Sequence, residues 1–206
     1  TDSILQSERI DLETAKDFVA DIGPEAARLT RITEDLLRLT KLDSGVMEAP
    51  VEVDVLPVLE QVMRMMSLLA QEKGVDLTYE AAEGCTVLAT KDEIHQVIYN
   101  LTDNAVKYSS SGGTVQVTLS REGEWVILQV ADNGAGIPEQ DLAKVFDRFY
   151  RVDKARSRAA GGTGLGLSIV SDTVRRRSGT VRAENRREGG ALFTVCWPLA
   201  GKGGSL

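Results

Sequence analysis

Hydrophobic residues recur every seven positions between residues 12 and 45, and this spacing predicts one long amphipathic helix. The two lines of the repeat comprise Phe18, Ile22, Leu29, Ile32, Leu36 and Leu39. Such a pair of lines is typical of a helix in a helical bundle. We expect a kink at Gly23-Pro24, because proline lacks a backbone donor and clashes with the preceding turn. Gly45 is a suitable left-handed cap for the end of the helix.

A different pattern begins at residue 51, after a linker over residues 46–50. Short alternating runs predict strands, and runs with apolar residues three and four apart predict helices. The predicted strands are residues 51–55, 76–79, 86–89, 115–120, 125–131, 181–185 and 192–198. The predicted helices are residues 57–72, 92–108 and 164–177. Because helices alternate with antiparallel strands, the fold class is α+β, a two-layer sandwich over residues 51–206 preceded by a helical segment over residues 1–45.

Composition limits the class of protein. The chain has 206 residues, of which 42% are hydrophobic and 27% charged, as in soluble globular proteins. It contains no long uncharged apolar run that could cross a membrane. Residues 1–60 hold 14 acidic and 6 basic residues, a balance of −8, so the total of −7 leaves +1 for the remainder. That balance disfavours general nucleic-acid binding.

The two cysteines, Cys85 and Cys196, stand far apart in apolar runs that predict strands. We interpret them as buried thiols of a reducing compartment rather than as a disulfide. The sequence holds no cluster of cysteine and histidine with the spacing of a metal site.

Polar residues gather along one side of the predicted helix over residues 92–108. Asn100, Asn104 and Lys107 project together beside its apolar stripe, with Tyr108 at the border. The stripe itself comprises Ile94, Val97, Ile98, Leu101 and Ala105. Partly buried amides are costly without a partner, so two of them one turn apart suggest a ligand such as a hydrated metal ion. A pair of surface amides is the alternative.

The run Asp132-Asn133-Gly134-Ala135-Gly136 follows a predicted strand. Asp-Asn-Gly alone is a turn signal, and a hairpin is the usual interpretation. However, Ile137-Pro138 follows, and then a polar helical start rather than a strand. A carboxylate beside glycines that admit a flat ligand can accept a hydrogen bond from an exocyclic amine, which favours adenine over guanine.

Glycines are also concentrated at Gly161-Gly162-Thr163-Gly164-Leu165-Gly166, before a predicted helix. Glycine amides at a helix N-terminus suit phosphate oxygens, although a flexible connector is the competing interpretation. The run lacks the Gly-Lys-Ser/Thr of the lysine-bearing phosphate loop, and no βαβ unit surrounds it as in a dinucleotide fold. Five lysines and arginines over residues 148–158 form a cationic stretch nearby, which by default is a solvated loop.

In this order and spacing the motifs closely resemble the catalytic ATP-binding domain of bacterial sensor histidine kinases. The matching stretches are residues 100–108, 132–136, 146–151 and 161–167. Residues 12–45 resemble the second helix of that family's dimerisation and phosphotransfer hairpin. The resemblance covers essentially the whole chain. It implies the histidine-kinase and gyrase type of ATPase fold, with a mixed sheet and three main helices.

The resemblance also implies roles for single residues. Asn104 would hold Mg²⁺, Lys107 and Arg151 would reach the phosphates of ATP, and Asp132 would bind the adenine amine. Phe146 and Phe149 would anchor a mobile lid over about residues 150–163. The other implied nucleotide-binding residues are Tyr108, Gly134, Gly136, Gly162, Thr163, Gly164, Leu165 and Gly166.

Asn100 separates two kinds of relative within this resemblance. In the related gyrase-type and chaperone ATPases a glutamate at this position activates water. An amide cannot take a proton at neutral pH. Asn100, as a catalytic residue, therefore favours transfer to a nucleophile over hydrolysis.

His95 is the only histidine of the chain, and Gln96 follows it. The family's phosphoacceptor is a histidine followed by Glu or Asp in the first hairpin helix, so we interpret His95 as a structural or surface residue. We expect the acceptor upstream of Thr1, and a chain that binds ATP without phosphorylating itself at the family's site. Another departure is Arg177-Ser178-Gly179, where the family often has His-Gly-Gly.

Family resemblance implies a protein histidine kinase of a two-component phosphorelay, with a response regulator as partner. It also implies a cytoplasmic catalytic core, a membrane-anchored sensor upstream and a homodimer of the intact kinase. This chain holds little of the first hairpin helix, so the seam of its long helix is expected to seek a partner.

Two other readings of the sequence stay open. One is a serine-directed anti-sigma-factor kinase of the same ATPase superfamily, which would not need the helix over residues 12–45. The other is a catalytically silent domain that only scaffolds a response regulator, and the intact set Asn104, Lys107 and Asp132 speaks against it.

Overall fold

The computed structural model describes residues 48–152 and 163–201, together with single positions between residues 22 and 40. Every described position in that early stretch is helical, in agreement with the predicted long helix. Gly23 is one of these helical positions, whereas Pro24 and the expected kink lie outside the described residues.

Three main helices follow, and local sequence explains where each begins and ends. Helix α3 (Val55–Lys73) starts at Asp54, whose carboxylate accepts a hydrogen bond from the Leu56 amide at 3.1 Å. Helix α4 (Lys91–Tyr108) starts with a capping box between Thr90 and Glu93. Helix α6 (Gly166–Arg176) begins at the last glycine of the glycine run and ends in basic residues.

The larger sheet has five strands in the order β2-β4-β5-β7-β6. Their bounds are Asp76–Ala81 for β2, Thr114–Glu122 for β4, Trp125–Asp132 for β5, Thr180–Asn185 for β6 and Ala191–Pro198 for β7. Strand β2 pairs with β4 in parallel, and the other pairs are antiparallel. A small second sheet pairs β1 (Val51–Asp54) with β3 (Thr86–Ala89). The expected mixed sheet with three main helices is thereby confirmed.

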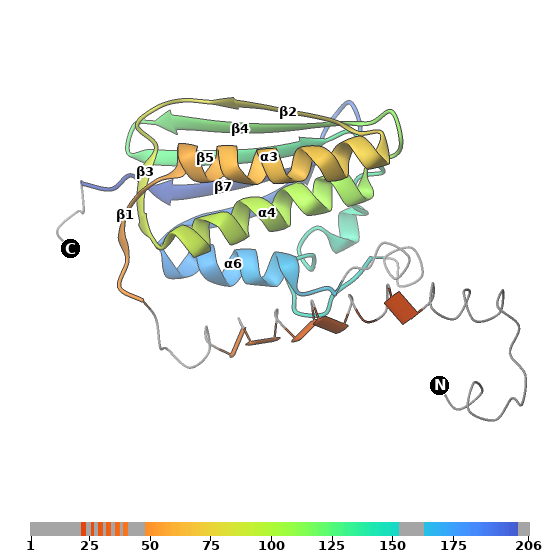
Figure 1. Cartoon of the computed structure of the whole chain (residues 1–206), viewed down its shortest axis with the longest axis horizontal. Helices are drawn as coiled ribbons and strands as arrows, with labels where there is room; N and C mark the ends of the chain where they lie inside the picture. The colour runs from red at the N-terminus through yellow and green to blue at the C-terminus, as the bar shows by residue number, and fades with distance from the viewer. Residues whose placement is uncertain are drawn as a thin grey trace, which may run out of the picture.

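Helices α3, α4 and α6 all lie on one face of the sheet, as Figure 1 shows. The core forms between these two layers. Strand β5 turns Val126, Leu128 and Val130 inward at alternate positions. The predicted apolar stripe of α4 is buried throughout, with every one of its residues at most 2% exposed.

A second, smaller group of buried side chains joins the long helix to the domain. Leu39 from the early helix, only 4% exposed, packs with Leu165 and Ile169 at the start of α6. One residue of the predicted seam therefore packs against the start of α6 rather than against another helix of a bundle.

Both cysteines are free thiols, as expected. Cys85 is buried, whereas Cys196 is partly exposed, so the prediction of two buried thiols is wrong for Cys196. In the described part of the chain, no helix is long and apolar enough to cross a bilayer.

Candidate functional site

A cavity of about 550 Å³ opens between α4, the end of β5 and the turn that joins β6 to β7. This volume is within the range typical of small-molecule sites. The described residues that line it are Asn104, Tyr108, Asp132, Ala135, Gly136, Ile137, Pro138, Val145, Val152, Leu167, Asn185, Arg186, Gly189, Gly190, Ala191 and Phe193. Four residues of the predicted site, namely Asn104, Tyr108, Asp132 and Gly136, are among them.

Asp132 is the last residue of β5 and is buried at 4% exposure. Its Oδ1 accepts hydrogen bonds from the Gly134 amide at 2.8 Å and from the Ala191 amide at 3.2 Å. Burial raises the pKa of this carboxyl, while the two amides and the charge of Arg186 act in the opposite direction. The arrangement presents a fixed acceptor to the cavity, with Oδ2 free of hydrogen bonds to the described residues.

Glycines beside Asp132 allow backbones to approach closely. A Cβ at Gly134 would lie 2.6 Å from the Tyr108 carbonyl oxygen, and one at Gly190 would lie 2.0 Å from the Asp132 carbonyl oxygen. Side chains at either position would force these segments apart. Gly134 thus serves contact with the end of α4, and it does not line the cavity among the described residues.

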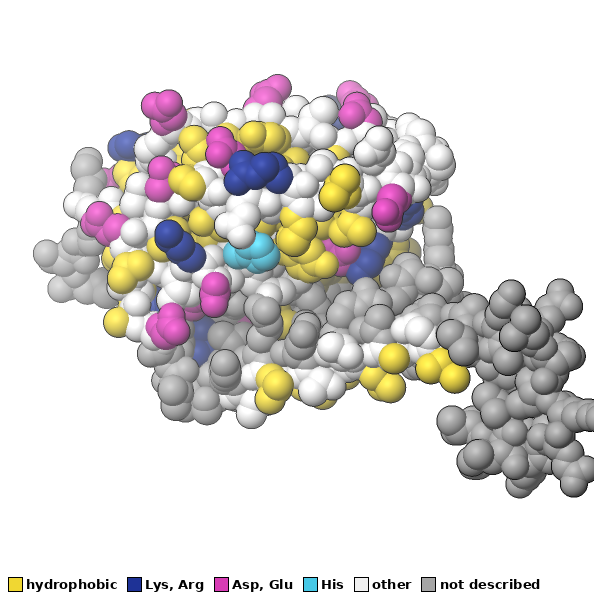
Figure 2. All heavy atoms as spheres, viewed as in Figure 1, with side chains coloured by type: hydrophobic (Ala, Val, Ile, Leu, Met, Phe, Trp, Pro, Cys, Tyr) yellow, Lys and Arg dark blue, Asp and Glu magenta, His cyan; other side chains and the backbone are white. Residues whose placement is uncertain are grey.

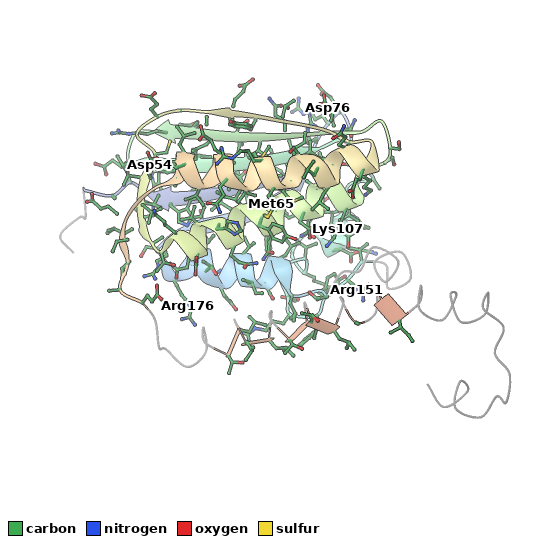
Figure 3. All side chains as sticks on the ribbon, viewed as in Figure 1. Asp54, Met65, Asp76, Lys107, Arg151 and Arg176 are labelled. Carbon is green, nitrogen blue, oxygen red and sulfur yellow. The ribbon has the colours of Figure 1, made fainter. Side chains whose placement is uncertain are left out.

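The C-terminal end of α4 carries Asn104, Lys107 and Tyr108. Asn104 and Tyr108 line the cavity, whereas Lys107 forms an ion pair with Asp103 at 2.6 Å. Lys73 from the end of α3 donates to the carbonyls of Val106, at 2.7 Å, and of Lys107. A cation at this position satisfies carbonyls that the helix leaves unpaired. Lys107 and Arg151 lie toward the same end of the domain (Figure 3).

Asn100 has hydrogen-bond partners within the protein. Its Oδ1 accepts a hydrogen bond from the side-chain Nε2 of Gln96 at 2.8 Å, and its Nδ2 donates to the backbone carbonyl of Gly166 at 3.0 Å. The expectation that both α4 amides need a ligand is therefore wrong for Asn100, because these contacts satisfy its buried amide. It does connect α4 to the glycine run, since Gly166 begins α6.

The glycine run stands at the start of α6, as predicted, and Gly162 lies outside the described residues. The Gly164 carbonyl accepts a hydrogen bond from the Phe149 amide at 2.9 Å. Thr163 Oγ1 accepts from the Leu165 amide at 3.2 Å. Leu167 lines the cavity from the start of α6, and the described glycines of the run do not.

The two phenylalanines expected to anchor a lid differ in their surroundings. Phe146 packs edge-on against Phe193 with ring centroids 6.3 Å apart. Phe149 is 60% exposed and adopts a left-handed backbone with φ of 63°, so its ring is not an anchor in this structure. Most of the expected lid, residues 153–162, lies outside the described residues.

His95 lies apart from the cavity. Its ring reaches the surface on the face formed by the helices (Figure 2) and stacks on Tyr99, with centroids 6.3 Å apart and planes 9° from parallel. It is not among the described lining residues, which agrees with a surface role.

Sequence reasoning missed one wall of the cavity, the turn between β6 and β7. Asn185 at the end of β6 lines it, together with Arg186, Gly189 and Gly190 of this turn. The glycine pair was a visible signal, but no local pattern indicated that the turn returns to Asp132, some fifty residues earlier in the chain.

Comparison with known families identifies this arrangement. Residues 89–201 match the family described as histidine kinase-, DNA gyrase B-, and HSP90-like ATPase. The chain belongs to this family. All the described lining residues fall inside the matched range.

Two similar relatives are histidine kinases of bacteria. The chain is 38% identical over 195 residues to the sensor histidine kinase WalK of Bacillus subtilis, covering 90% of this chain and 31% of WalK. It is 34% identical over 184 residues to the histidine-protein kinase BaeS of Escherichia coli, covering 88% of this chain and 39% of BaeS. The chain thus spans less than half the length of either relative.

A solved structure shows the same architecture. Full-length ShkA in complex with AMPPNP aligns with a TM-score of 0.75 at 29% sequence identity, over 93% of this chain and 40% of that one.

Proposed function

We propose that the cavity binds ATP with Mg²⁺ and that the domain transfers the γ-phosphoryl group to a histidine, as the catalytic core of a sensor histidine kinase. The observation that carries this proposal is the Asp132 carboxylate, fixed at the inner wall of a cavity that also presents Asn104 and Tyr108. Family membership and the sensor-kinase relatives support the choice of ATP.

In this proposal Asp132 accepts the exocyclic amine of adenine. Asn104 offers an amide oxygen, the hard type of ligand that Mg²⁺ prefers. Among the described residues, no group of three or more acidic, histidine or cysteine side chains is placed to hold a metal ion. That suits a magnesium ion held mainly by nucleotide phosphates and water, with a single protein ligand. Such an ion neutralises charge on the transferred phosphoryl group.

Lys107 and Arg151 are the cations proposed to reach the phosphates. Lys107 is held by Asp103 here, so it must exchange this carboxylate for a phosphate when nucleotide binds. Thr163, Gly164, Leu165 and Gly166, at the start of α6, remain the proposed phosphate-side backbone together with Gly162.

Asn100 is proposed to act near the transferred group as a neutral polar residue. Since its amide cannot act as a base, the acceptor must bring its own base, as a histidine followed by an acidic residue does. His95 does not meet this description, because Gln96 follows it and it stacks on Tyr99 away from the cavity.

Calorimetry with a non-hydrolysable ATP analogue and Mg²⁺ tests the binding step. Saturable binding with one nucleotide per chain is expected, and no binding at millimolar analogue would overturn the proposal. The transfer step is tested with γ-labelled ATP and a helical hairpin that carries a histidine followed by an acidic residue. Acid-labile, base-stable label on that histidine is expected. Label on His95 of this chain, or on a serine of an antagonist protein, would contradict it.

We further propose a response-regulator aspartate as the final acceptor and a second copy of the chain as the partner of the long helix. Ile22, Leu29 and Leu36 of its apolar seam are 48%, 55% and 43% exposed. Sedimentation at several concentrations tests the second copy, and a strictly monomeric chain would refute it.

A further inference from the structure

The loop after β5 has few backbone partners of its own. Strand β5 ends at Asp132, and the next regular element, a short 3₁₀ helix, begins at Glu139. Between them Ala135, Gly136, Ile137 and Pro138 all line the cavity. Something outside the loop must hold these residues if they are to form a fixed wall.

Asn185, the last residue of β6, holds this loop through both ends of its amide. Its Oδ1 accepts a hydrogen bond from the Ile137 backbone amide at 2.8 Å, and its Nδ2 donates to the Ile137 carbonyl at 2.6 Å. Only this orientation of the amide satisfies both groups, because a flipped amide would face donor to donor and acceptor to acceptor.

The contact also depends on the backbone of Gly136. This glycine has φ of +71°, and a Cβ built there would lie 2.9 Å from Asn185 Oδ1. A side chain would therefore push the clasp apart. Asn185 and Gly136 fit together, and both line the cavity.

Residues of the β6–β7 turn and the start of β7 hold the start of the loop. The Arg186 guanidinium donates to the Asp132 carbonyl at 2.9 Å, and the Ala191 amide donates to Asp132 Oδ1. The residues at and beside the β6–β7 turn thus bind the loop at two places. One is Asp132, just before the loop, and the other is Ile137, within it. Ile137 in turn packs against the hydrophobic core, so the wall is fixed on both sides.

We infer that Asn185 is a positioning residue for nucleotide binding: by clasping Ile137 it sets the wall on which the adenine base lies, beside its acceptor Asp132. This inference rests on the proposed function. It concerns the base end of the ligand alone, so its loss should weaken ATP and ADP equally. A residue that acts at the phosphates would change the ratio between the two.

The test compares Asn185→Ala with Asn185→Ser and with Thr180→Ala. Thr180 is an exposed neutral residue at the other end of the same strand, and it does not line the cavity. Two lost hydrogen bonds are expected to weaken ATP and ADP binding by the same factor, about tenfold, in Asn185→Ala. Asn185→Ser, which keeps a short polar group, should lose less, and Thr180→Ala should bind like the wild type.

Amide hydrogen exchange measures the contact between Asn185 and Ile137 directly, in the absence of nucleotide. The Ile137 amide should exchange faster in Asn185→Ala, while the amides within β5 keep their protection. Unaltered exchange at Ile137, unaltered nucleotide affinity, or a loss confined to ATP would each overturn the inference. Should Asn185→Ala fail to fold, Asn185→Ser carries the same comparison. If the wild type binds neither nucleotide, the proposed function itself fails. If the wild type and the variant bind equally well, only the inference about Asn185 fails.

Discussion

Asp132 accepts hydrogen bonds from two backbone amides through Oδ1 alone. Its structural contacts therefore use one oxygen, and the proposed contact with adenine uses the other, Oδ2. An Asp132→Asn variant can keep the oxygen that accepts from Gly134 and Ala191, while an NH₂ group replaces the second oxygen. That group donates where adenine also donates. We expect ATP affinity to fall at least about tenfold. Calorimetry measures the affinity, and equal binding by variant and wild type would contradict the role of Asp132.

The raised pKa of Asp132 gives the same prediction a pH dependence. A group whose pKa is higher in the folded state favours its protonated form there, so the ionised carboxylate is a cost that Asp132→Asn removes. The nucleotide-free variant should therefore melt no lower than the wild type at neutral pH. Wild-type affinity for adenine nucleotide should weaken as pH falls through a range above the ordinary pKa of aspartate. Melting temperatures and titrations at several pH values check both signs.

Asn104 lines the cavity and supplies the amide oxygen proposed for Mg²⁺. Asn104→Ala should weaken ATP binding about tenfold in the presence of Mg²⁺, because the ion loses its protein ligand. With EDTA in place of Mg²⁺, variant and wild type should bind alike. The comparison of variant with wild type in EDTA is the control for the comparison in Mg²⁺. An equal loss under both conditions would assign Asn104 to the nucleotide rather than to the ion.

At the scale of elements, an ion pair joins the end of α6 to the start of α4. Arg177 donates through two nitrogens to the two carboxylate oxygens of Glu93, at 2.9 and 2.8 Å, and the side chains are only 10% and 15% exposed. Glu93 also belongs to the capping box of α4. Arg177→Ala leaves this carboxylate buried without its cation, and we expect a loss of about 2–4 kcal/mol in the free energy of unfolding.

Urea denaturation followed by circular dichroism measures that loss. Arg175→Ala, two residues earlier at an exposed position of α6, is the matched control and should change stability by less than about 1 kcal/mol. Arg177 stands in Arg177-Ser178-Gly179, where the resemblance implies that the family often has His-Gly-Gly. An Arg177→Ala variant as stable as the control would show that this departure has no structural role.

The elements were predictable from sequence to different degrees. The apolar stripe of α4 and the alternation along β5 follow from period alone, and both agree with the structure. The parallel pairing of β2 with β4 does not follow, because α4 and other elements intervene and register depends on distant partners. The site residues divide in the same way. Asn104 and Asp132 could be proposed from motifs, because each motif lies within one short segment of the chain. Asn185 could not, since its partner Ile137 is 48 residues away.

At the scale of the whole molecule, the described residues form two hydrophobic clusters in different places. The larger cluster fills the space between the sheet and the helices. The small one, of Leu39, Leu165 and Ile169, joins the long helix to the start of α6. Because Leu165 belongs to the proposed phosphate side, the helix touches the domain next to the site rather than at its far end.

The cavity is built by segments from distant parts of the chain, so a ligand there should stabilise the whole domain. A ligand that binds only the folded state adds about 2.7 kcal/mol at a concentration one hundred times its Kd. For a chain of this length we therefore expect ATP with Mg²⁺ to raise the melting temperature by roughly 5–10 °C. Asp132→Asn, under the same conditions, should show about half of this shift or less, because a tenfold weaker affinity leaves about 1.4 kcal/mol of stabilisation. A wild-type melting temperature unmoved by millimolar ATP and Mg²⁺ would argue against nucleotide binding in the cavity.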